Sequence, residues 1–332
     1  MAKLLECVPN FSEGSDLKVI GKITSAIKSA GGIKLLDTFS GADTNRTVVT
    51  FAGTPDDVIE AAFRGIEAAS LCIDMSGQKG VHPRMGATDV CPLIPLAGMT
   101  MAETVEYARR LAERVGEELQ IPVYCYEYAA FSDERRTLES IRHGEYEGLK
   151  NKMTLPGWRP DFGPAEWNEK VKRTGAVIIG ARNYLIAYNV ALDTDSLEIA
   201  RDIAAAVRES GSQIRSPGSL KKVKAIGWYI EEYGCVQVSM NITDFNSTPV
   251  HIAFEEVSRQ AKLRGVNVTG SELVGLIPLK AISDAGKYYI SKTGLNENLS
   301  EKETIAVGVR HLGLDAIHPF NPEKRVIEYL IK

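Results

Sequence analysis

The chain of 332 residues is predicted to be an α+β protein that contains two ferredoxin-like βαββαβ subdomains in tandem, the product of a duplication. First, the order strand, helix, strand, strand, helix, strand occurs once in each half, and this order defines the ferredoxin-like motif. Second, a Thr-Pro dipeptide opens the second helix of both halves. Third, Ile-Pro-Leu occurs in the last predicted strand of both halves.

The elements of the first half follow from periodicity and from helix-end signals. The apolar run LLECVPNF predicts a strand, and the following segment has the 3.6-residue spacing of an amphipathic helix that ends at a Gly-Gly pair. Thr54 and Pro55 predict the start of the second helix, because Thr is a good N-cap and Pro is tolerated at the first helical position. The predicted elements are a strand at 4–11, a helix at 16–31, strands at 33–39 and 46–53, a helix at 55–74 and a strand at 90–96.

The second half repeats this pattern with a strand at 184–192, a helix at 196–210, strands at 223–232 and 235–243, a helix at 249–264 and a strand at 273–282. We therefore expect an N-terminal subdomain at 1–178 and a C-terminal subdomain at 179–332. The first includes a connecting segment, 148–174, with three prolines, two tryptophans and no sustained periodicity. Long ordered connections of this kind are usually functional.

Composition excludes several classes of protein. The net charge of −4 and the pI near 5.9 argue against nucleic acid as the main partner. Five scattered cysteines without C-x-x-C spacing indicate buried thiols in a reducing compartment. The short polar N-terminus does not resemble a signal peptide, and no apolar run is long enough to span a membrane. We therefore expect a cytoplasmic protein with no membrane partner.

A comparison of the two halves identifies one loop as a candidate site. Thr54 and Ile94 are 40 positions apart, whereas the matching Thr248 and Ile277 are 29 apart, so the first half carries 11 extra residues. They fall around SGQKGVHPRMGATD, between the second helix and the last strand. Because the second half is expected to fold without this insertion, the fold does not require the loop.

The loop contains three residues with chemical potential. Pro83 favours an extended backbone at His82, which then serves either as a general acid or base near neutral pH or as a structural hydrogen-bonding group. Arg84 either binds a substrate carboxylate in bidentate fashion or pairs with a surface acid. Asp89 either orients His82 or caps the turn after Gly86, and its spacing does not distinguish the two.

Two further polar clusters lie beside predicted strands. Asn45 and Arg46 precede a strand, where their side chains reach a pocket at the sheet end or a solvated edge. Asn10 follows a strand, and Ser12 is expected to cap the next helix. The remaining histidines are expected to be structural, namely His143, His251, His311 and His318. No dinucleotide, P-loop or metalloprotease motif is present, and His82 and Asp89 lack neighbouring ligands, so we expect no metal.

Longer motifs carry a resemblance to a known family. The stretches CVPNFSEG, TNRTVVTF, GVHPRMGATDVCPLIPL, RRTLESIRHGEYEGL, PDFGP, GARNYLIAYNV, KKVKAIGWYIEEYG and SELVGLIPLKA occur in this order from Cys7 to Tyr329. Together they resemble the formiminotransferase domain of the glutamate formimidoyltransferases, which in animals is fused to a cyclodeaminase. The chain resembles a stand-alone transferase of this family.

The resemblance implies a reaction. It predicts a cytoplasmic homodimer of histidine degradation with a folate groove between two ferredoxin-like subdomains. Its substrates are N-formimino-L-glutamate and tetrahydrofolate, with the formimino group moving to N5 and glutamate released. The catalytic acid and base implied is His82. The substrate-binding candidates are Asn10, Asn45, Arg46, Arg84 and Arg182, and the folate-binding candidates are Gly163, Pro164 and Gly175.

Two departures from the animal relatives qualify this assignment. The segment after Pro164 is about three residues longer by alignment of its motifs, which affects the folate contacts expected at 165–174. Phe39 stands where the animal relatives have an acidic residue, so Asp37 or Asp43 would have to supply a carboxylate if one is needed. The rival readings are a formyltransferase that uses N-formylglutamate, a non-catalytic folate-binding protein and a metal-dependent hydrolase.

Overall fold

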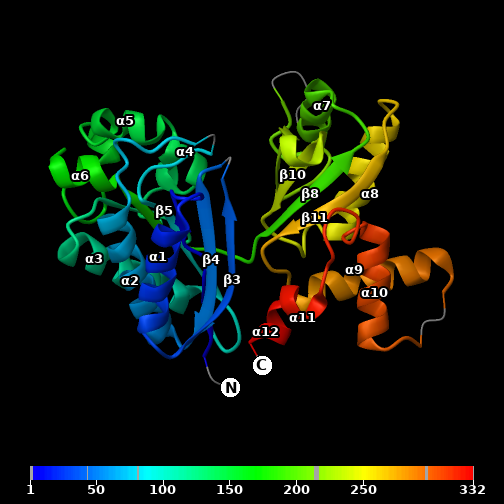
Figure 1. Cartoon of the computed structure of the whole chain (residues 1–332), viewed down its shortest axis with the longest axis horizontal. Helices are drawn as coiled ribbons and strands as arrows, with labels where there is room; N and C mark the ends of the chain where they lie inside the picture. The colour runs from blue at the N-terminus through cyan, green and yellow to red at the C-terminus, as the bar shows by residue number, and fades with distance from the viewer. Residues whose placement is uncertain (1–2, 43, 81, 213–216, 296–297, 332) are drawn as a thin grey trace. The chain divides into compact units, whose positions relative to one another are not determined.

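The computed structural model describes residues 3–42, 44–80, 82–212, 217–295 and 298–331. It forms two compact units, Met1–Asn183 and Tyr184–Lys332, each with its own sheet and helices (Figure 1). The boundary expected at residue 178 falls inside strand β7 (Val177–Ala181). Since β7 pairs with two strands of the first unit, the division comes after this strand.

The first unit contains a seven-stranded sheet. The short strands β1 and β2 lie end to end between β4 and β5, and β3 pairs with the other side of β4. These pairings are antiparallel, whereas β7 extends the sheet by parallel pairing with β5 and β6. The strands other than β7 are β1 (Leu5–Cys7), β2 (Asn10–Phe11), β3 (Ile33–Gly41), β4 (Arg46–Gly53), β5 (Thr88–Pro95) and β6 (Val123–Glu127).

Helices α1 (Leu17–Ser29), α2 (Pro55–Cys72) and α3 (Met101–Glu118) bury apolar side chains in the main core of this unit. A second, smaller core joins β5, β6 and β7 to three short helices, α4 (Leu138–Arg142), α5 (Glu145–Lys152) and α6 (Glu169–Thr174). Single 3-10 turns lie at Asp133–Arg135 and Pro156–Trp158. The segment 148–174, expected to lack regular structure, is therefore partly helical.

Helix α1 begins differently from the expectation. Its N-cap is Asp16, whose carboxylate accepts hydrogen bonds from the amides of Lys18 and Val19. The proposed cap, Ser12, is instead buried and donates its hydroxyl to the Gly86 carbonyl oxygen at 2.7 Å. Ser12 therefore ties the start of the first unit to the candidate loop.

The second unit has a four-stranded antiparallel sheet in the order β11-β8-β10-β9. Helices on this sheet share one buried core with it. The strands are β8 (Ile186–Leu192), β9 (Val223–Ile230), β10 (Cys235–Ile242) and β11 (Val268–Val274), and a 3-10 turn spans Glu231–Tyr233. The helices are α7 (Leu197–Val207), α8 (Val250–Lys262), α9 (Leu279–Thr293), α10 (Glu301–Leu312), α11 (Pro322–Arg325) and α12 (Ile327–Leu330).

The strand order confirms the duplicated ferredoxin-like arrangement. Numbered by their place in each motif, the strands of the second unit lie in the order fourth, first, third, second. The first unit has the same order in β5, the β1–β2 strand, β4 and β3. Helix α3 and strands β6 and β7 are additions to this motif, as are α9 to α12 in the second unit.

The Ile-Pro-Leu and Thr-Pro sequences, which were used to align the two halves, have different structures in the two units. The strand expected at 273–282 ends at Val274, and Pro278 of the Ile-Pro-Leu sequence is the N-cap of α9. Thr248 does not cap α8, because Pro249 holds that position. The extra loop length is real nonetheless: residues 73–87 separate α2 from β5, whereas only 263–267 separate α8 from β11.

Gly175, in the segment before β7, allows the close approach of that segment to the candidate loop. It has φ +65°, and a Cβ atom there would lie 2.2 Å from the carbonyl oxygen of Met85. We expect Gly175→Ala to lower the free energy of unfolding by about 2–4 kcal/mol, from the left-handed backbone and the clash together. The matched control is Gly148→Ala in α5, where nothing lies within 4 Å and Ala should stabilise by up to ~1 kcal/mol.

The measurement is urea unfolding followed by circular dichroism. Equal unfolding free energies for the Gly175→Ala variant and the wild type would contradict the close approach of Gly175 to Met85.

Candidate active site

The described residues of the loop at 73–87 are fixed to the fold at both ends and at Lys79. The Met75 amide donates to the Arg173 carbonyl oxygen at 2.8 Å, and the Ala87 amide donates to that of Thr174 at 2.8 Å. In the middle of the loop, the side-chain amide of Asn45 donates to the Lys79 carbonyl oxygen at 2.6 Å. The loop therefore presents His82 from an anchored backbone.

Asn45 uses both ends of its side chain for this anchoring. Its Oδ1 accepts from the Gly14 amide at 2.9 Å while its Nδ2 reaches the loop. Its backbone has φ 46°, a left-handed conformation that Asn tolerates better than most residues. The geometry supports a scaffolding role for Asn45, and substrate binding by this residue stays a prediction.

Arg84 is also engaged within the protein. It forms a bidentate ion pair with Glu147, at 2.8 and 2.6 Å, and contacts Glu145 at 3.2 Å. Its Nε and Nη2 donate to the side chain and the backbone of Gln78. Of the two roles considered for Arg84, these contacts support pairing with surface acids, which joins the loop to α5.

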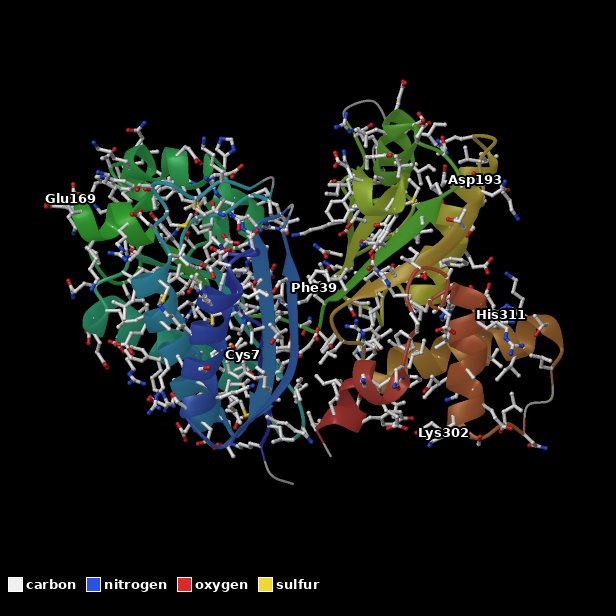
Figure 2. The ribbon with its side chains drawn as sticks, in the orientation of Figure 1. Cys7, Phe39, Glu169, Asp193, Lys302 and His311 are labelled. Carbon is white, nitrogen blue, oxygen red and sulfur yellow. The ribbon has the colours of Figure 1, made fainter. Side chains whose placement is uncertain are left out.

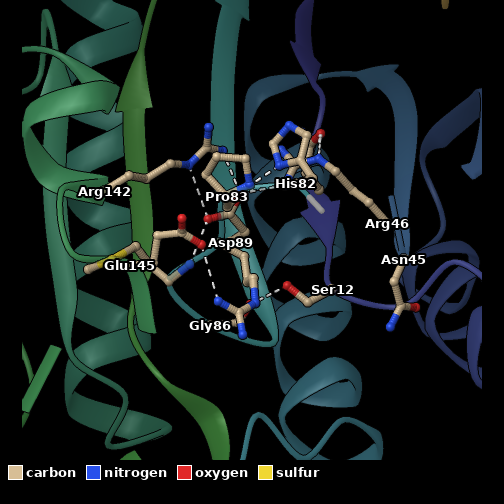
Figure 3. Close-up of polar contacts among 12 residues, drawn as sticks. Ser12, Asn45, Arg46, His82, Pro83, Gly86, Asp89, Arg142 and Glu145 are labelled. Carbon is tan, nitrogen blue, oxygen red and sulfur yellow. Dashed lines mark hydrogen bonds and ion pairs between the residues drawn. The ribbon is translucent and has the colours of Figure 1, made fainter. Parts of the chain in front are cut away.

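Asp89 lies at a β-bulge between β2 and β5. The register pairs Phe11 with Thr88 and Asn10 with Val90, so Asp89 is the extra residue. A bulge re-aims a side chain. Here the Asp89 carboxylate is fully buried and binds both Arg46 and Arg142 (Figure 3).

The Asp89 carboxylate also accepts a hydrogen bond from the Met85 amide at 3.0 Å, which closes the turn of the loop. Burial opposes ionisation of Asp89, but the charges of Arg142 and Arg46 and their hydrogen bonds outweigh it and lower its pKa to about 2. Of the two roles considered for Asp89, the turn contact is present. The ring of His82 bonds to Pro83 instead.

Arg46 and Asn10 act together. Arg46 Nε donates to the side-chain oxygen of Asn10 at 3.1 Å, and Asn10 Nδ2 donates to the Val8 carbonyl oxygen at 2.8 Å. Burial, partly offset by Asp89, lowers the pKa of Arg46 to about 10, so its guanidinium stays charged at neutral pH. Arg46 on β4 and Asn10 on β2 therefore form one side of the candidate site.

The imidazole of His82 is half-buried beside the arginines, with Nδ1 2.7 Å from the Pro83 carbonyl oxygen. Because a carbonyl oxygen only accepts, Nδ1 carries the proton and the Nε2 lone pair is left as the basic site. Burial, followed by the charges of Arg46 and Arg142, lowers the pKa of His82 to about 4, against the opposing effects of Asp89 and the Pro83 carbonyl. At neutral pH this histidine is a neutral base.

Arg142 is the site residue that sequence reasoning missed. It ends α4 and contacts Asp89 through Nε and Nη2, although the two residues are 53 positions apart. It lies within RRTLESIRHGEYEGL, one of the motifs that carry the family resemblance. No spacing or periodicity distinguishes Arg142 from the other arginines of that motif.

Four of the sequence candidates lie outside this cluster. Arg182 follows β7, its amide donates to the Leu93 carbonyl oxygen of β5, and its guanidinium bonds to the Tyr126 hydroxyl, so it has no direct contact with Asp89 or His82 among the described residues. Gly163 has φ +79° and packs against the backbone of Ile121 before β6, with Pro164 adjoining it. Gly175 contacts the candidate loop through Met85 and Gly86. Their ligand-binding roles stay predictions.

Phe39 lies on edge strand β3 and is 39% exposed (Figure 2). It pairs with Val48, while Asp37 pairs with Thr50, four positions from Arg46 along β4. Asp37 is therefore farther than Phe39 from the cluster along this ladder, and the other suggested replacement, Asp43, lies outside the described residues. In the described structure Asp89 is the carboxylate that the arginines share beside His82.

The remaining sequence expectations concern residues away from the cluster. All five cysteines are free thiols. His251 is buried and stacks on Tyr288, His311 stacks on Tyr289, and His318 bonds to the Tyr233 hydroxyl.

Across the described ranges no three His, Cys, Asp or Glu side chains are grouped to hold a metal ion. Within the same ranges no helix is both long and apolar enough to cross a membrane.

Comparison with known proteins covers both units. The formiminotransferase domain, N-terminal subdomain, matches residues 4–182, and the formiminotransferase domain matches 187–332. The chain is 50% identical over 332 residues to the formimidoyltransferase-cyclodeaminase of Gallus gallus. This match covers 100% of the chain but 60% of that relative, so the chain spans about three-fifths of the length of such relatives.

Shorter relatives match over nearly their whole length. The glutamate formimidoyltransferase of Streptococcus pyogenes serotype M1 is 43% identical, with 87% of this chain and 94% of the relative covered. That of Thermoplasma acidophilum is also 43% identical, with 90% and 97% covered.

The shared carboxylate should control the stability of the first unit. We expect Asp89→Asn to lower the free energy of unfolding by about 3–5 kcal/mol, because two guanidinium groups then lose their buried counter-charge. The control is Asp133→Asn, whose exposed ion pair with Arg136 should be worth no more than about 0.5 kcal/mol. Urea unfolding measures both, and an equal loss in the two variants would contradict the special role of Asp89.

The lowered pKa of His82 should appear in the pH dependence of stability. Between pH 6.5, its ordinary value, and about pH 4, the unfolded chain binds the proton that the folded chain excludes. As the pH is lowered through this window, the free energy of unfolding should therefore decrease more steeply in the wild type than in a His82→Gln variant. Unfolding at pH 7 and pH 5 tests this, and parallel losses in the two proteins would contradict a depressed pKa.

Proposed function

Because the chain belongs to the formiminotransferase family, we propose that it transfers the formimino group of N-formimino-L-glutamate to N5 of tetrahydrofolate and releases L-glutamate. The observation that carries this proposal within the site is the position of the His82 ring, whose Nδ1 faces the Pro83 carbonyl oxygen and leaves Nε2 as the basic nitrogen, beside two arginines that help to lower its pKa. A base and cationic groups are what the reaction needs, since the N5 proton must be removed and both substrates are anionic.

The reaction follows from these groups. N5 of tetrahydrofolate attacks the formimino carbon, a C–N bond forms, and His82 Nε2 accepts the proton that N5 loses. The imidazolium then delivers this proton to the glutamate nitrogen of the tetrahedral intermediate, whose bond to carbon breaks. A positioned acid and base contributes roughly 10²–10⁴-fold to the rate, and juxtaposition of the two substrates supplies much of the rest.

The arginines have separate parts in this proposal. Arg46, whose guanidinium donates to Asn10, is proposed to bind a glutamate carboxylate beside His82. Arg84 holds the loop through its ion pairs with α5. Gly163, Pro164, Gly175 and Arg182 are proposed as folate and substrate contacts on the strength of the family resemblance alone.

Two alternatives share the same site. N-formylglutamate differs from the formimino donor by an oxygen in place of one NH group, and a neutral histidine serves either donor. A non-catalytic folate-binding protein would not need a base with a free Nε2, so His82 favours an enzyme. Presenting tetrahydrofolate with each donor in turn and identifying the folate product decides among them. Folate binding without turnover would overturn the catalytic proposal.

The assembly and location are part of the same proposal. We propose a cytoplasmic homodimer, as the family resemblance implies. Sedimentation equilibrium measures the oligomeric state, and a monomer at micromolar concentration would contradict it.

His82→Gln removes the titrating nitrogen while keeping a polar side chain of similar size. We expect its kcat to fall by about 10²–10⁴-fold with folate affinity unchanged, since binding does not require the proton transfer. His143→Gln is the matched control, because this exposed histidine lies at the end of α4, next to Arg142. Steady-state and single-turnover kinetics measure the effect. Wild-type kcat in His82→Gln would remove His82 from the mechanism.

A further inference from the structure

The charges around Asp89 do not balance. Arg46 and Arg142 each carry a positive charge, and the single buried carboxylate between them supplies one negative charge. Their side chains are only 11% and 14% exposed, so water screens the excess positive charge weakly. Buried charges are normally paired, and one more anion would complete this cluster.

The two arginines also keep hydrogen-bond donors in reserve. Arg46 uses Nε for Asn10 and Nη1 for Asp89, and Arg142 uses Nε and Nη2 for Asp89. Among the described residues, Nη2 of Arg46 and Nη1 of Arg142 have no hydrogen-bond partner. Neither is among the fully buried side-chain atoms that lack a partner. Figure 3 shows the two guanidinium groups on either side of Asp89, with the His82 ring close by.

We propose that Arg46 and Arg142 jointly bind a carboxylate of the glutamate-derived substrate, and that this bound carboxylate sets the protonation of His82. The inference rests on the proposed function, since it names the anion as part of the donor substrate. It adds Arg142 to the binding residues and makes the substrate itself a component of the acid–base machinery.

The coupling follows from the groups that face the imidazole. They are Arg46 from β4, Arg142 from α4, Asp89 from β5 and the Pro83 carbonyl within the loop. In the free protein, burial and the two arginines hold the pKa of His82 near 4, below the range in which a histidine transfers protons efficiently at neutral pH. An added carboxylate cancels the excess positive charge and raises the proton affinity of His82.

This coupling suits both halves of the reaction. While the donor is bound, its carboxylate stabilises the imidazolium that forms when Nε2 takes the N5 proton. The same carboxylate belongs to the glutamate that receives that proton, so it stays until the C–N bond has broken. When glutamate leaves, the arginines regain their excess charge and His82 returns to the neutral base.

The test uses L-glutamate, the product, which carries the same carboxylates and does not react alone. The pKa of His82 is followed by the ring signals in a ¹H–¹³C NMR titration, assigned by their loss in His82→Gln. We expect saturating glutamate to raise this pKa by at least about one unit, which corresponds by linkage to an about tenfold tighter binding of glutamate to the protonated form. Calorimetry in two buffers of different ionisation enthalpy should then detect proton uptake on binding near pH 5.

Substitutions separate charge from hydrogen bonding. Arg142→Gln removes one positive charge, so it should raise the pKa of His82 in the free protein and weaken glutamate binding. Arg142→Lys keeps the positive charge but loses the planar guanidinium that can donate two parallel hydrogen bonds. It should therefore leave the pKa of His82 in the free protein low while weakening glutamate binding. Arg136→Gln, which removes an exposed arginine paired with Asp133, is the matched control and should change neither quantity.

Three results would overturn the inference: no binding of glutamate, binding without a change in the His82 titration, or an equal change with acetate at the same ionic strength. Each can occur while formimino transfer is intact, because turnover is measured separately. Conversely, if neither donor is turned over but glutamate still shifts His82, the proposed function fails and the binding site stands.

Discussion

Asp89 sits at a bulge of the first sheet, and its buried carboxylate is bound by Arg46, Arg142 and the Met85 amide. These partners come from β4, from α4 and from the candidate loop, so one side chain joins three segments that are distant in sequence. The same ion pairs set the field at His82. Stability of the first unit and chemistry of the histidine therefore depend on one carboxylate, whose ionisation the flanking arginines protect.

The fold is largely readable from the sequence because its signals are local. Strand β4 and the start of α2 were predicted at their observed residues, since strand periodicity and the Thr-Pro cap specify them directly. The error at Ile277 to Leu279 has a physical cause. Gly275, with φ +81°, ends the strand early, and Pro278 begins a helix, whereas Pro95 of the matching tripeptide closes β5. The same Ile-Pro-Leu sequence therefore ends a strand in one half and begins a helix in the other, because the neighbouring residues decide its structure.

The site was only partly readable. His82 stood out because its loop exceeds the length of the corresponding loop in the second half, which is a property of the sequence. Arg142 did not, because its importance comes from a tertiary contact with a residue 53 positions away. Arg84 and Asn45 show the converse. Both were candidates for substrate binding, but their polar groups form the contacts that hold the loop in place.

The shared strand order of the two units also shows which parts of the site lie outside the repeated motif. The second unit has a short connection where the first has residues 73–87, and both β7, which pairs with β5, and α4 lie outside the repeated βαββαβ order. The strand order that the two units share therefore includes neither the loop that bears His82 nor the helix that bears Arg142. The candidate site thus combines side chains on strands of the shared frame, those of Arg46 and Asp89, with side chains on segments that only the first unit has, those of His82 and Arg142.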